Sequence, residues 1–163
     1  MAPRLNHETA KKITNTSGST EDGTIAASTR AGAVDTANLS TGSKVGLVHL
    51  GWGGFASAHL GTLLNDIAAP QKGDWGVSAV SMRSGNRRDE LEPQDGLYTV
   101  TERRADGAPT QLVDVVKESL VAPEDPNAVI ERMANPATKV VTMTVPQQGY
   151  DLPSADQIAS LDA

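Results

Sequence analysis

The sequence of 163 residues contains no cysteine, which excludes disulfides and thiolate metal sites. Its three histidines, His7, His49 and His59, are scattered without the spacing of a zinc site, so we predict no metal site. Aromatic residues make up only 3% of the chain, and a core must therefore rely on Val, Leu, Ile and Ala. No apolar run reaches the length of a membrane-spanning helix.

The chain also lacks an excess of positive charge, since its formal net charge is −6. Broad binding to nucleic acid or to an anionic membrane needs a basic surface, so neither is expected as a partner. Arg4, Lys11 and Lys12 near the N-terminus are not followed by an apolar stretch, so we expect no secretory signal. We therefore expect a cytoplasmic protein.

Composition divides the chain near Lys44. Residues 15–43 are rich in Ser, Thr, Gly, Ala and Asp, with isolated apolar residues and no hydrophobic period. Such a stretch cannot bury enough apolar area to offset the conformational entropy lost on ordering. We predict a disordered or poorly ordered arm over residues 1–43, in which a short helix around His7–Ile13 is compatible with the pattern, and a folded domain over residues 44–163.

The folded part opens with the pattern of a β-α-β unit. Val45–Leu50 is an apolar run ended by glycines, typical of a strand buried on both faces of a parallel sheet. A helix over residues 54–68 is indicated by apolar residues at i, i+3, i+4 and i+7, namely Leu60, Leu63, Leu64 and Ile67. The apolar run Trp75–Met82 predicts the next strand.

The rest of the domain is less regular. Two alternating segments, residues 97–101 and 111–116, flank the turn pair Asp106–Gly107 and predict an antiparallel hairpin inserted into the α/β unit. Asp125–Pro126 predicts the start of a helix, and residues 139–145 are predicted as the third parallel strand. Because no element then closes the sheet, we expect the domain to be incomplete at its C-terminal end.

Gly51-x-Gly53-x-x-Ala56 lies between the first strand and the first helix, where a glycine fingerprint indicates dinucleotide binding. The first glycine permits the tight turn, the second permits close approach of a pyrophosphate, and the small third residue lets the helix pack on the strand. The helix N-terminus then offers its amides to the phosphates. The pattern predicts an α/β fold with a Rossmann-like parallel sheet, while a tight turn without a ligand is the alternative.

Residues 49–59, His-Leu-Gly-Trp-Gly-Gly-Phe-Ala-Ser-Ala-His, resemble the N-terminal signature of the mannitol dehydrogenase family of polyol dehydrogenases and sugar-acid reductases. The resemblance extends over about residues 44–150, and further matches follow in order at Asp74–Trp75, Met82–Ser84, Gln94–Thr99, Asn135–Thr138 and Gly149–Tyr150. It implies a nicotinamide cofactor, NAD or NADP. The cofactor-binding residues that it implies at the first turn and after the third strand are Gly51, Trp52, Gly53, Gly54, Phe55, Thr144 and Val145.

Two departures from the family pattern concern charge. Ser57 stands where the signature has an arginine, which removes a cation near the phosphates or the active-site mouth. Pro146–Gln147 replaces the family's Thr-Glu, which removes a negative charge and a backbone donor. Either change is expected to weaken cofactor binding or the domain interface.

The end of the second strand commonly selects between NAD and NADP. A carboxylate there binds the adenosine ribose, whereas an arginine accommodates a 2′-phosphate. No carboxylate precedes Asp89 in this segment, and the candidate cofactor-binding residues are Arg83, Ser84 and Asn86, with Arg87 and Arg88 beside them. The three arginines favour NADP(H). Arg87 and Arg88 as solvated helix charges are the alternative.

Hydride transfer needs a group that exchanges a proton with the substrate oxygen. The resemblance places that group on a C-terminal helical domain with the spacing Lys-x-x-x-x-Asn-x-x-His, which does not occur here, so no catalytic residue is assigned. We expect the N-terminal cofactor-binding part of an NAD(P)-dependent oxidoreductase that interconverts a polyol or sugar acid with its keto form, inactive without its C-terminal substrate domain. The alternative, favoured by Ser57 and Gln147, is a stand-alone, non-catalytic nucleotide-binding or interaction module.

Overall fold

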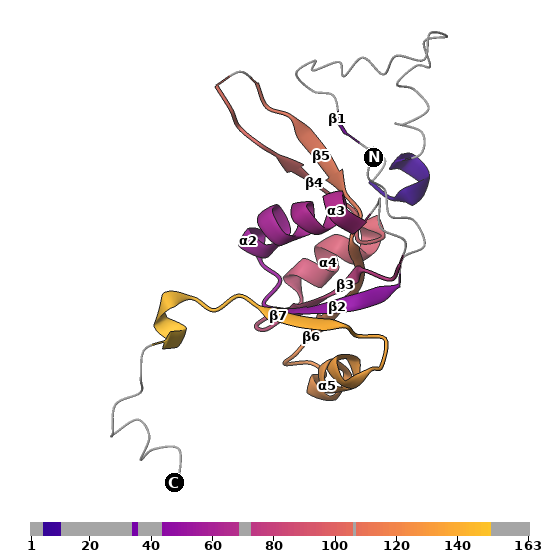
Figure 1. The fold of residues 1–163 in the computed structure, drawn as a ribbon, viewed down its shortest axis with the longest axis vertical. Coiled ribbons are helices and arrows are strands. Elements are labelled where there is room, and N and C mark those ends of the chain that lie inside the picture. The colour runs from indigo at the N-terminus through magenta and orange to yellow at the C-terminus, as the bar shows by residue number, and fades with distance from the viewer. Residues whose placement is uncertain (1–4, 11–33, 36–43, 69–72, 106, 151–163) are drawn as a thin grey trace.

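A four-stranded parallel sheet forms the centre of the molecule in a computed structural model, which describes residues 5–10, 34–35, 44–68, 73–105 and 107–150 (Figure 1). The strand order is β6-β3-β2-β7, and every neighbouring pair is parallel. The strands are β2 (Val45–Leu50), β3 (Gly76–Ser81), β6 (Val116–Val121) and β7 (Val140–Met143). The chain therefore adds two strands on one side of β2 and then crosses to the other side, which confirms the predicted Rossmann-like α/β class.

The first crossover is a continuous helical segment over residues 54–68, as predicted. It consists of α2 (Gly54–Ala56), the π-helical turn η1 (Ser57–Gly61) and α3 (Thr62–Ala68). Leu64 is buried against the core, but Leu63 and Ile67 of the same predicted apolar face are exposed. A π turn carries one residue more than an α turn, so it shifts the face that the following turns present to the sheet.

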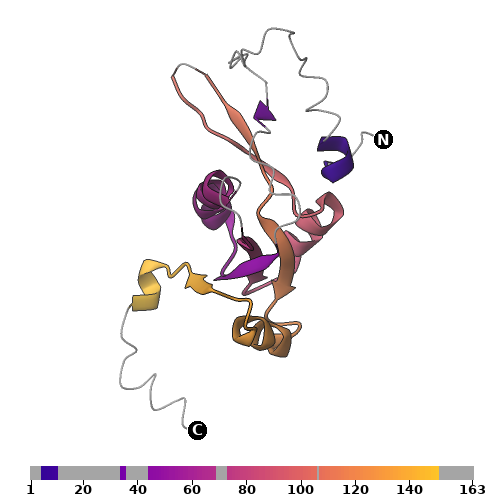
Figure 2. The ribbon, with the colours of Figure 1, turned by 45° about the vertical axis from the view of Figure 1, so that its right-hand side comes forward.

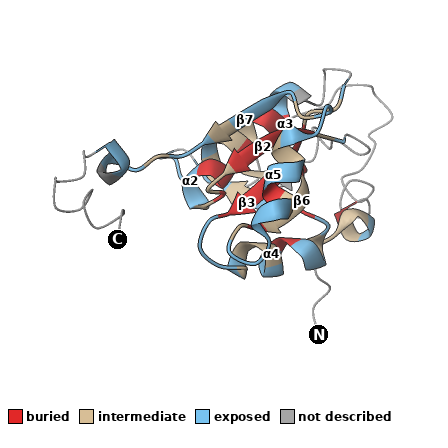
Figure 3. Ribbon diagram, turned by 90° about the horizontal axis from the view of Figure 1, so that it is seen from below, coloured by how far each residue is buried: buried red, intermediate tan, exposed pale blue. Residues whose placement is uncertain are grey.

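Helices cover both faces of the sheet (Figure 1). On one face, α3 and α4 (Asn86–Leu91) place Leu64 and Leu91 over Leu47 and Val77 of the strands. On the other face, α5 (Pro126–Ala134) packs through Val129 on a second cluster of strand residues, Val48, Val80, Leu50 and Leu120. Figure 3 shows the result, with buried residues concentrated in β2 and β3 between largely exposed helices.

The predicted start of α5 is confirmed. The side chain of Asp125 accepts a hydrogen bond of 2.9 Å from the amide of Ala128, and Pro126 occupies the first helical position. This cap satisfies one of the first-turn amides that a helix leaves without a partner.

The predicted hairpin is also present, between β4 (Tyr98–Thr101) and β5 (Thr110–Val113), and it extends away from the parallel sheet (Figures 1 and 2). It follows the short 3-10 helix η2 (Glu92–Gln94), and its far end is closed by a bridge between Arg104 and Gly107. Asp106 of the predicted turn pair lies outside the described residues. The short strand β1 (Val34–Asp35) pairs in parallel with β5.

One strand assignment from the sequence was wrong. The second hairpin strand ends at Val113 rather than Val116, and residues 116–121 form β6, the third parallel strand. The segment predicted as the third parallel strand is β7, which is the fourth strand of the parallel sheet in chain order. The short 3-10 helix η3 (Gln147–Tyr150) follows it. The polar residues of β6 give it no apolar pattern that predicts a buried strand. Their partners come from other elements, since Ser78 donates to Glu118 over 2.6 Å and Arg132 donates to Glu118 over 2.5 Å.

Part of the N-terminal segment expected to be poorly ordered packs on the hairpin. His7–Ala10 is helical, and Ala10, with 0% exposure, clusters with Leu97 and Leu112. The Nε2 atom of His7 lies 3.1 Å from Oδ1 of the fully buried Asp114, and Nζ of Lys117 lies 2.6 Å from the same oxygen. Apart from residues 34–35, the rest of the predicted arm lies outside the described residues.

Candidate dinucleotide-binding site

The turn after β2 is held between the ends of two neighbouring strands. The amides of Gly51 and Trp52 both donate to the carbonyl oxygen of Val80 in β3, over 2.9 and 3.0 Å. On the other side, the amide of Thr144, just past β7, donates to the carbonyl oxygen of Leu50. Gly51 has a φ of 92°, a conformation that residues with a side chain rarely adopt. The first glycine is thus required by the fold itself.

Gly53 and Gly54 differ from Gly51, because the fold gives no reason for them to be glycine. Gly53 has an extended conformation with a φ of −111°, and a Cβ there would meet only the carbonyl oxygen of Gly51, at 3.9 Å. A Cβ on Gly54 would meet nothing within 4 Å. Their missing side chains therefore leave space outside the turn, into which a ligand can approach the backbone.

The turn over residues 51–54, called the glycine corner below, is followed by amides that the helix does not use as donors. The amide of Ser57 donates to the carbonyl oxygen of Gly53 over 2.9 Å. The amides of Gly54, Phe55 and Ala56 precede this bond, and first-turn amides have no acceptor within their own helix. Open space and unused donors at a helix N-terminus fit the diphosphate of a dinucleotide.

The remaining candidate residues lie at the same edge of the sheet. Arg83 and Ser84 follow the carboxyl end of β3, and Thr144 and Val145 follow the carboxyl end of β7. Because β3, β2 and β7 are parallel neighbours, these ends adjoin one another, and the strand order reverses between β2 and β7. Ligands of open α/β sheets bind at such a reversal. Arg83, Ser84, Asn86 and Thr144 are exposed, and Val145 is half-buried.

The two aromatic candidates of the loop are placed differently. Trp52 is only 2% exposed and packs in the core, edge-on to His49 with ring centroids 5.5 Å apart. Since its amide already binds Val80, neither the side chain nor the N–H of Trp52 is available to a ligand. Phe55 is 68% exposed and contacts His59, with ring centroids 4.5 Å apart. Phe55 therefore leaves an apolar surface beside the open glycines.

The three arginines after β3 are not equivalent. Arg88 forms ion pairs with Glu124 and Asp89. Arg87 binds Glu90 over 2.6 Å and the hydroxyl of Ser57 over 2.8 Å. Of the three, only Arg83 has no ion pair within the described part of the chain. A cation from α4 thus lies beside Ser57, the position at which the family resemblance leads us to expect an arginine.

His49 joins the two strands on either side of the reversal in strand order. Its side chain, 3% exposed, places Nδ1 2.9 Å from the hydroxyl of Thr142 and Nε2 3.1 Å from the hydroxyl of Thr144. Burial lowers the pKa of His49, and this outweighs the hydrogen bond with the backbone of Gly51, which raises it. At neutral pH an uncharged imidazole therefore links β2 to β7, two residues before the first glycine of the corner.

This linkage predicts a loss of stability in acid. Because the folded pKa of His49 lies below the unfolded value of 6.5, its contribution is complete above about pH 6.5 and is lost as the pH falls towards the folded pKa. The slope is at most about 1.4 kcal/mol per pH unit. His49→Gln keeps a donor and an acceptor but does not titrate. Urea unfolding between pH 5 and 8 should give a smaller acid loss for the variant, and identical pH profiles would contradict a neutral His49.

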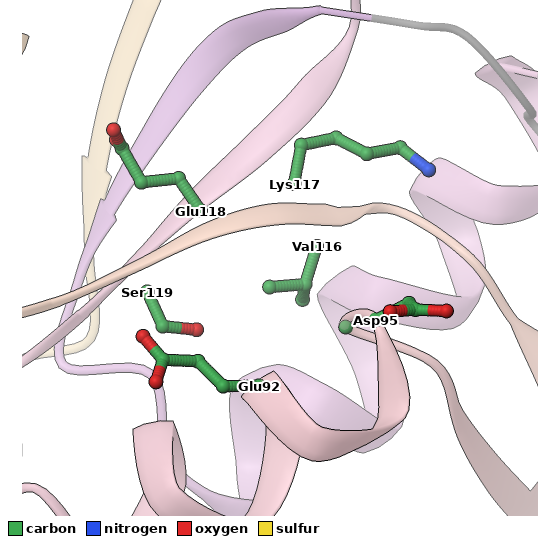
Figure 4. Close-up of a pocket in the computed structure, with 7 residues that line it drawn as sticks. Glu92, Asp95, Val116, Lys117, Glu118 and Ser119 are labelled. Carbon is green, nitrogen blue, oxygen red and sulfur yellow. The ribbon is translucent and has the colours of Figure 1, made fainter. Parts of the chain in front are cut away.

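A separate pocket near the start of β6 does not involve the glycine corner. It is lined by Glu92, Asp95, Gly96, Val116, Lys117, Glu118 and Ser119. Figure 4 shows Lys117 and Glu118 turned away from Glu92; these two side chains bind Asp114 and Arg132, respectively. Within the described residues, no cluster of His, Cys, Asp or Glu is suited to a metal ion, and no helix is long and apolar enough to cross a bilayer.

The strand order, the glycine corner and its unused amides define a Rossmann domain of the dinucleotide-binding class. Residues 45–159 match the family described as the mannitol dehydrogenase Rossmann domain. The chain therefore belongs to the mannitol dehydrogenase family, as the sequence motifs indicate.

Known proteins agree with this assignment. The chain is 40% identical over 112 residues to mannitol 2-dehydrogenase of Pyrenophora tritici-repentis, covering 67% of this chain and 20% of that protein. It resembles the solved mannitol 2-dehydrogenase of Pseudomonas fluorescens in complex with NAD and D-mannitol, with a TM-score of 0.67, 25% identity and coverage of 86% of this chain and 26% of that one. A solved D-sorbitol dehydrogenase gives a TM-score of 0.61 with 30% identity, covering 71% of this chain and 25% of that one. The chain thus spans about a fifth of the length of the curated relative.

Sequence reasoning missed the side chains that support the corner. The links from His49 to Thr142 and Thr144 join residues more than 90 positions apart, and the link from Arg87 to Ser57 spans 30 positions. The one available signal was that polar residues sit within otherwise apolar strands, which often marks a paired group. A polar residue in an apolar strand does not, however, indicate which distant residue is its hydrogen-bond partner.

Proposed function

We propose that this chain binds a nicotinamide dinucleotide and is the N-terminal cofactor-binding part of an NAD(P)-dependent oxidoreductase that interconverts a polyol or sugar acid with its keto form. The observation that carries the proposal is the open corner at Gly53 and Gly54, where neither backbone conformation nor packing demands glycine. A diphosphate at this place would accept hydrogen bonds from the amides of Gly54, Phe55 and Ala56.

The bound cofactor would supply hydride transfer, and the residues of this chain would hold and orient it. The neighbouring solved structure contains NAD and D-mannitol, and the curated relative is a mannitol 2-dehydrogenase. Hydride transfer also needs a proton donor or acceptor at the substrate oxygen. We assign that group and the substrate site to the part of the relatives that this chain does not span.

Exposed apolar side chains support a partner domain beside the corner. Phe55, Leu63 and Ile67 are exposed along the first helical segment, and β7, at the edge of the sheet, exposes Val140, Val141 and Met143. Exposed large apolar side chains of this kind are typical of interaction sites when they lie together. We propose that the substrate domain of the oxidoreductase covers this surface.

For the adenosine end we propose a preference for NADP(H) that rests on Arg83. Arg83 and Ser84 are exposed at the carboxyl end of β3, and Arg83 has no ion pair within the described residues, whereas Arg87 and Arg88 do. An arginine at this strand end suits a 2′-phosphate. No carboxylate lies between Arg83 and Asp89 to bind the ribose instead.

Fluorescence titration of the purified chain with NADH and NADPH tests both proposals. We expect binding of both, tighter for NADPH, and Arg83→Ala should weaken NADPH binding about tenfold with little effect on NADH, as expected for one charge-assisted contact. Arg103→Ala, which removes an exposed arginine of the hairpin, is the control and should change neither affinity. If neither dinucleotide binds, the cofactor role is wrong; tighter binding of NADH would overturn only the preference.

A further inference from the structure

Ser57 receives hydrogen bonds from two other elements, and only one of them continues to the glycine corner. The Nη2 atom of Arg87 in α4 donates to Oγ of Ser57 over 2.8 Å, and Nη1 of Arg87 binds Glu90 over 2.6 Å. The hydroxyl of Ser57 in turn donates to the carbonyl oxygen of Gly53 over 2.9 Å. A directed chain of hydrogen bonds thus runs from the Arg87 guanidinium through Ser57 to the corner.

This chain acts on the peptide that presents a free amide. The carbonyl oxygen of Gly53 accepts both the hydroxyl and the amide of Ser57, each over 2.9 Å. In a trans peptide the carbonyl and the following N–H point in opposite directions, so holding the Gly53 carbonyl towards the helix directs the Gly54 amide outward. Hydrogen bonds that polarise a carbonyl also strengthen the N–H of the same peptide as a donor.

The position of Arg87 carries a cost that packing does not explain. Its Nε atom is buried without a hydrogen-bond acceptor among the described residues, although the side chain is 35% exposed. A buried donor without a partner is unfavourable, and such a group in a native structure calls for an explanation. Orientation of the Gly53–Gly54 peptide supplies one.

We propose that Arg87 is a positioning residue for the dinucleotide diphosphate: acting through Ser57, it holds the Gly53–Gly54 peptide so that the Gly54 amide donates to a phosphate oxygen. This inference rests on the proposed cofactor role. The sequence suggested that Arg87 binds the 2′-phosphate, which only NADP carries. The diphosphate, in contrast, is common to NAD and NADP. Loss of Arg87 should therefore weaken both dinucleotides equally.

Tyr98 provides a matched control. Its hydroxyl donates to the backbone carbonyl oxygen of Ser57 over 2.9 Å, so it contacts the same residue as Arg87 but does not continue to Gly53. Burial raises the pKa of Tyr98, and the hydroxyl keeps its proton at neutral pH. Tyr98→Phe removes one hydrogen bond to Ser57, as Arg87→Met does, and leaves the chain to the corner intact.

The experiment titrates the full chain and its Arg87→Met, Ser57→Ala, double and Tyr98→Phe variants with NADH and NADPH, alongside their melting temperatures. Arg87→Met and Ser57→Ala should each weaken both dinucleotides about tenfold, the order expected for one charge-assisted contact. The double variant should be no weaker than the worse single variant, because both changes break one chain of hydrogen bonds. Tyr98→Phe should lower the melting temperature but leave both affinities within about twofold, well below the effect of a lost charged contact.

Each contrary result has a distinct meaning. A loss confined to NADPH would make Arg87 a ligand of the 2′-phosphate, and additive losses or unchanged affinities would also overturn the positioning role. If Arg87→Met does not fold, Ser57→Ala breaks the same chain with the loss of one hydroxyl, and unchanged affinity there has the same consequence. If the unmodified chain binds neither dinucleotide, the proposed function fails and this inference fails with it.

Discussion

Gly53→Val is expected to abolish dinucleotide binding while the domain stays folded. A side chain at this position projects into the open space where the phosphates would approach the backbone, and its Cβ atom would meet only the carbonyl oxygen of Gly51, at 3.9 Å. The extended backbone of Gly53 also suits valine, although valine is a poor helix cap and costs about 1 kcal/mol of stability. Titration with NADH and NADPH should show affinity reduced at least about 100-fold, since close phosphate approach is the role of this glycine.

Gly51→Ala is the matched control from the same turn. The φ of 92° at Gly51 makes any side chain strained, so this variant should lose about 1–2 kcal/mol of unfolding free energy. The two glycines should therefore fail in different ways, Gly53→Val in binding and Gly51→Ala first in stability. Unchanged affinity in Gly53→Val would remove the phosphate role from the corner and leave only a tight turn.

Asp114→Ala is expected to be the most destabilising single change, lowering the unfolding free energy by about 3–5 kcal/mol. The Asp114 side chain is fully buried and accepts from Lys117 over 2.6 Å and from His7 over 3.1 Å. Removing it leaves the Lys117 ammonium, only 14% exposed, without its carboxylate. Urea unfolding measures the loss, and hydrogen exchange should increase in residues 5–10, because His7 loses its buried partner.

Glu102→Ala tests whether burial is the reason for the large loss of stability expected in Asp114→Ala. Glu102 pairs with Arg104 on the hairpin, but both side chains are more than half exposed, so the change should leave the unfolding free energy almost unchanged. A loss in Asp114→Ala as small as that in Glu102→Ala would mean that Lys117 and His7 find water or new partners easily. The N-terminal segment would then owe its position to the contacts of Ala10 and Leu5 with the hairpin.

The predictable parts of the fold are those with strong local patterns. The β2 run, the helix over residues 54–68 and the cap at Asp125 were predicted and found, because apolar period and capping chemistry act over a few neighbouring residues. β6 was not predicted, because it lies at the sheet edge with a Lys-Glu-Ser run in its centre. Those polar residues are compatible with a strand only when Ser78, Arg132 and Asp114 are already nearby.

The site divides in the same way. The glycine fingerprint and the residues around it indicated the family and the glycine corner. They could do so because the residues that form this turn, including Gly51 with its positive φ, are neighbours in the sequence. The burial of Trp52, the engagement of Arg87 and Arg88, and the contacts of His49 with Thr142 and Thr144 depend on which elements meet. Local sequence therefore determined where a diphosphate is expected, whereas only the tertiary structure decided which side chains support that place, because their partners lie tens of residues away in the chain.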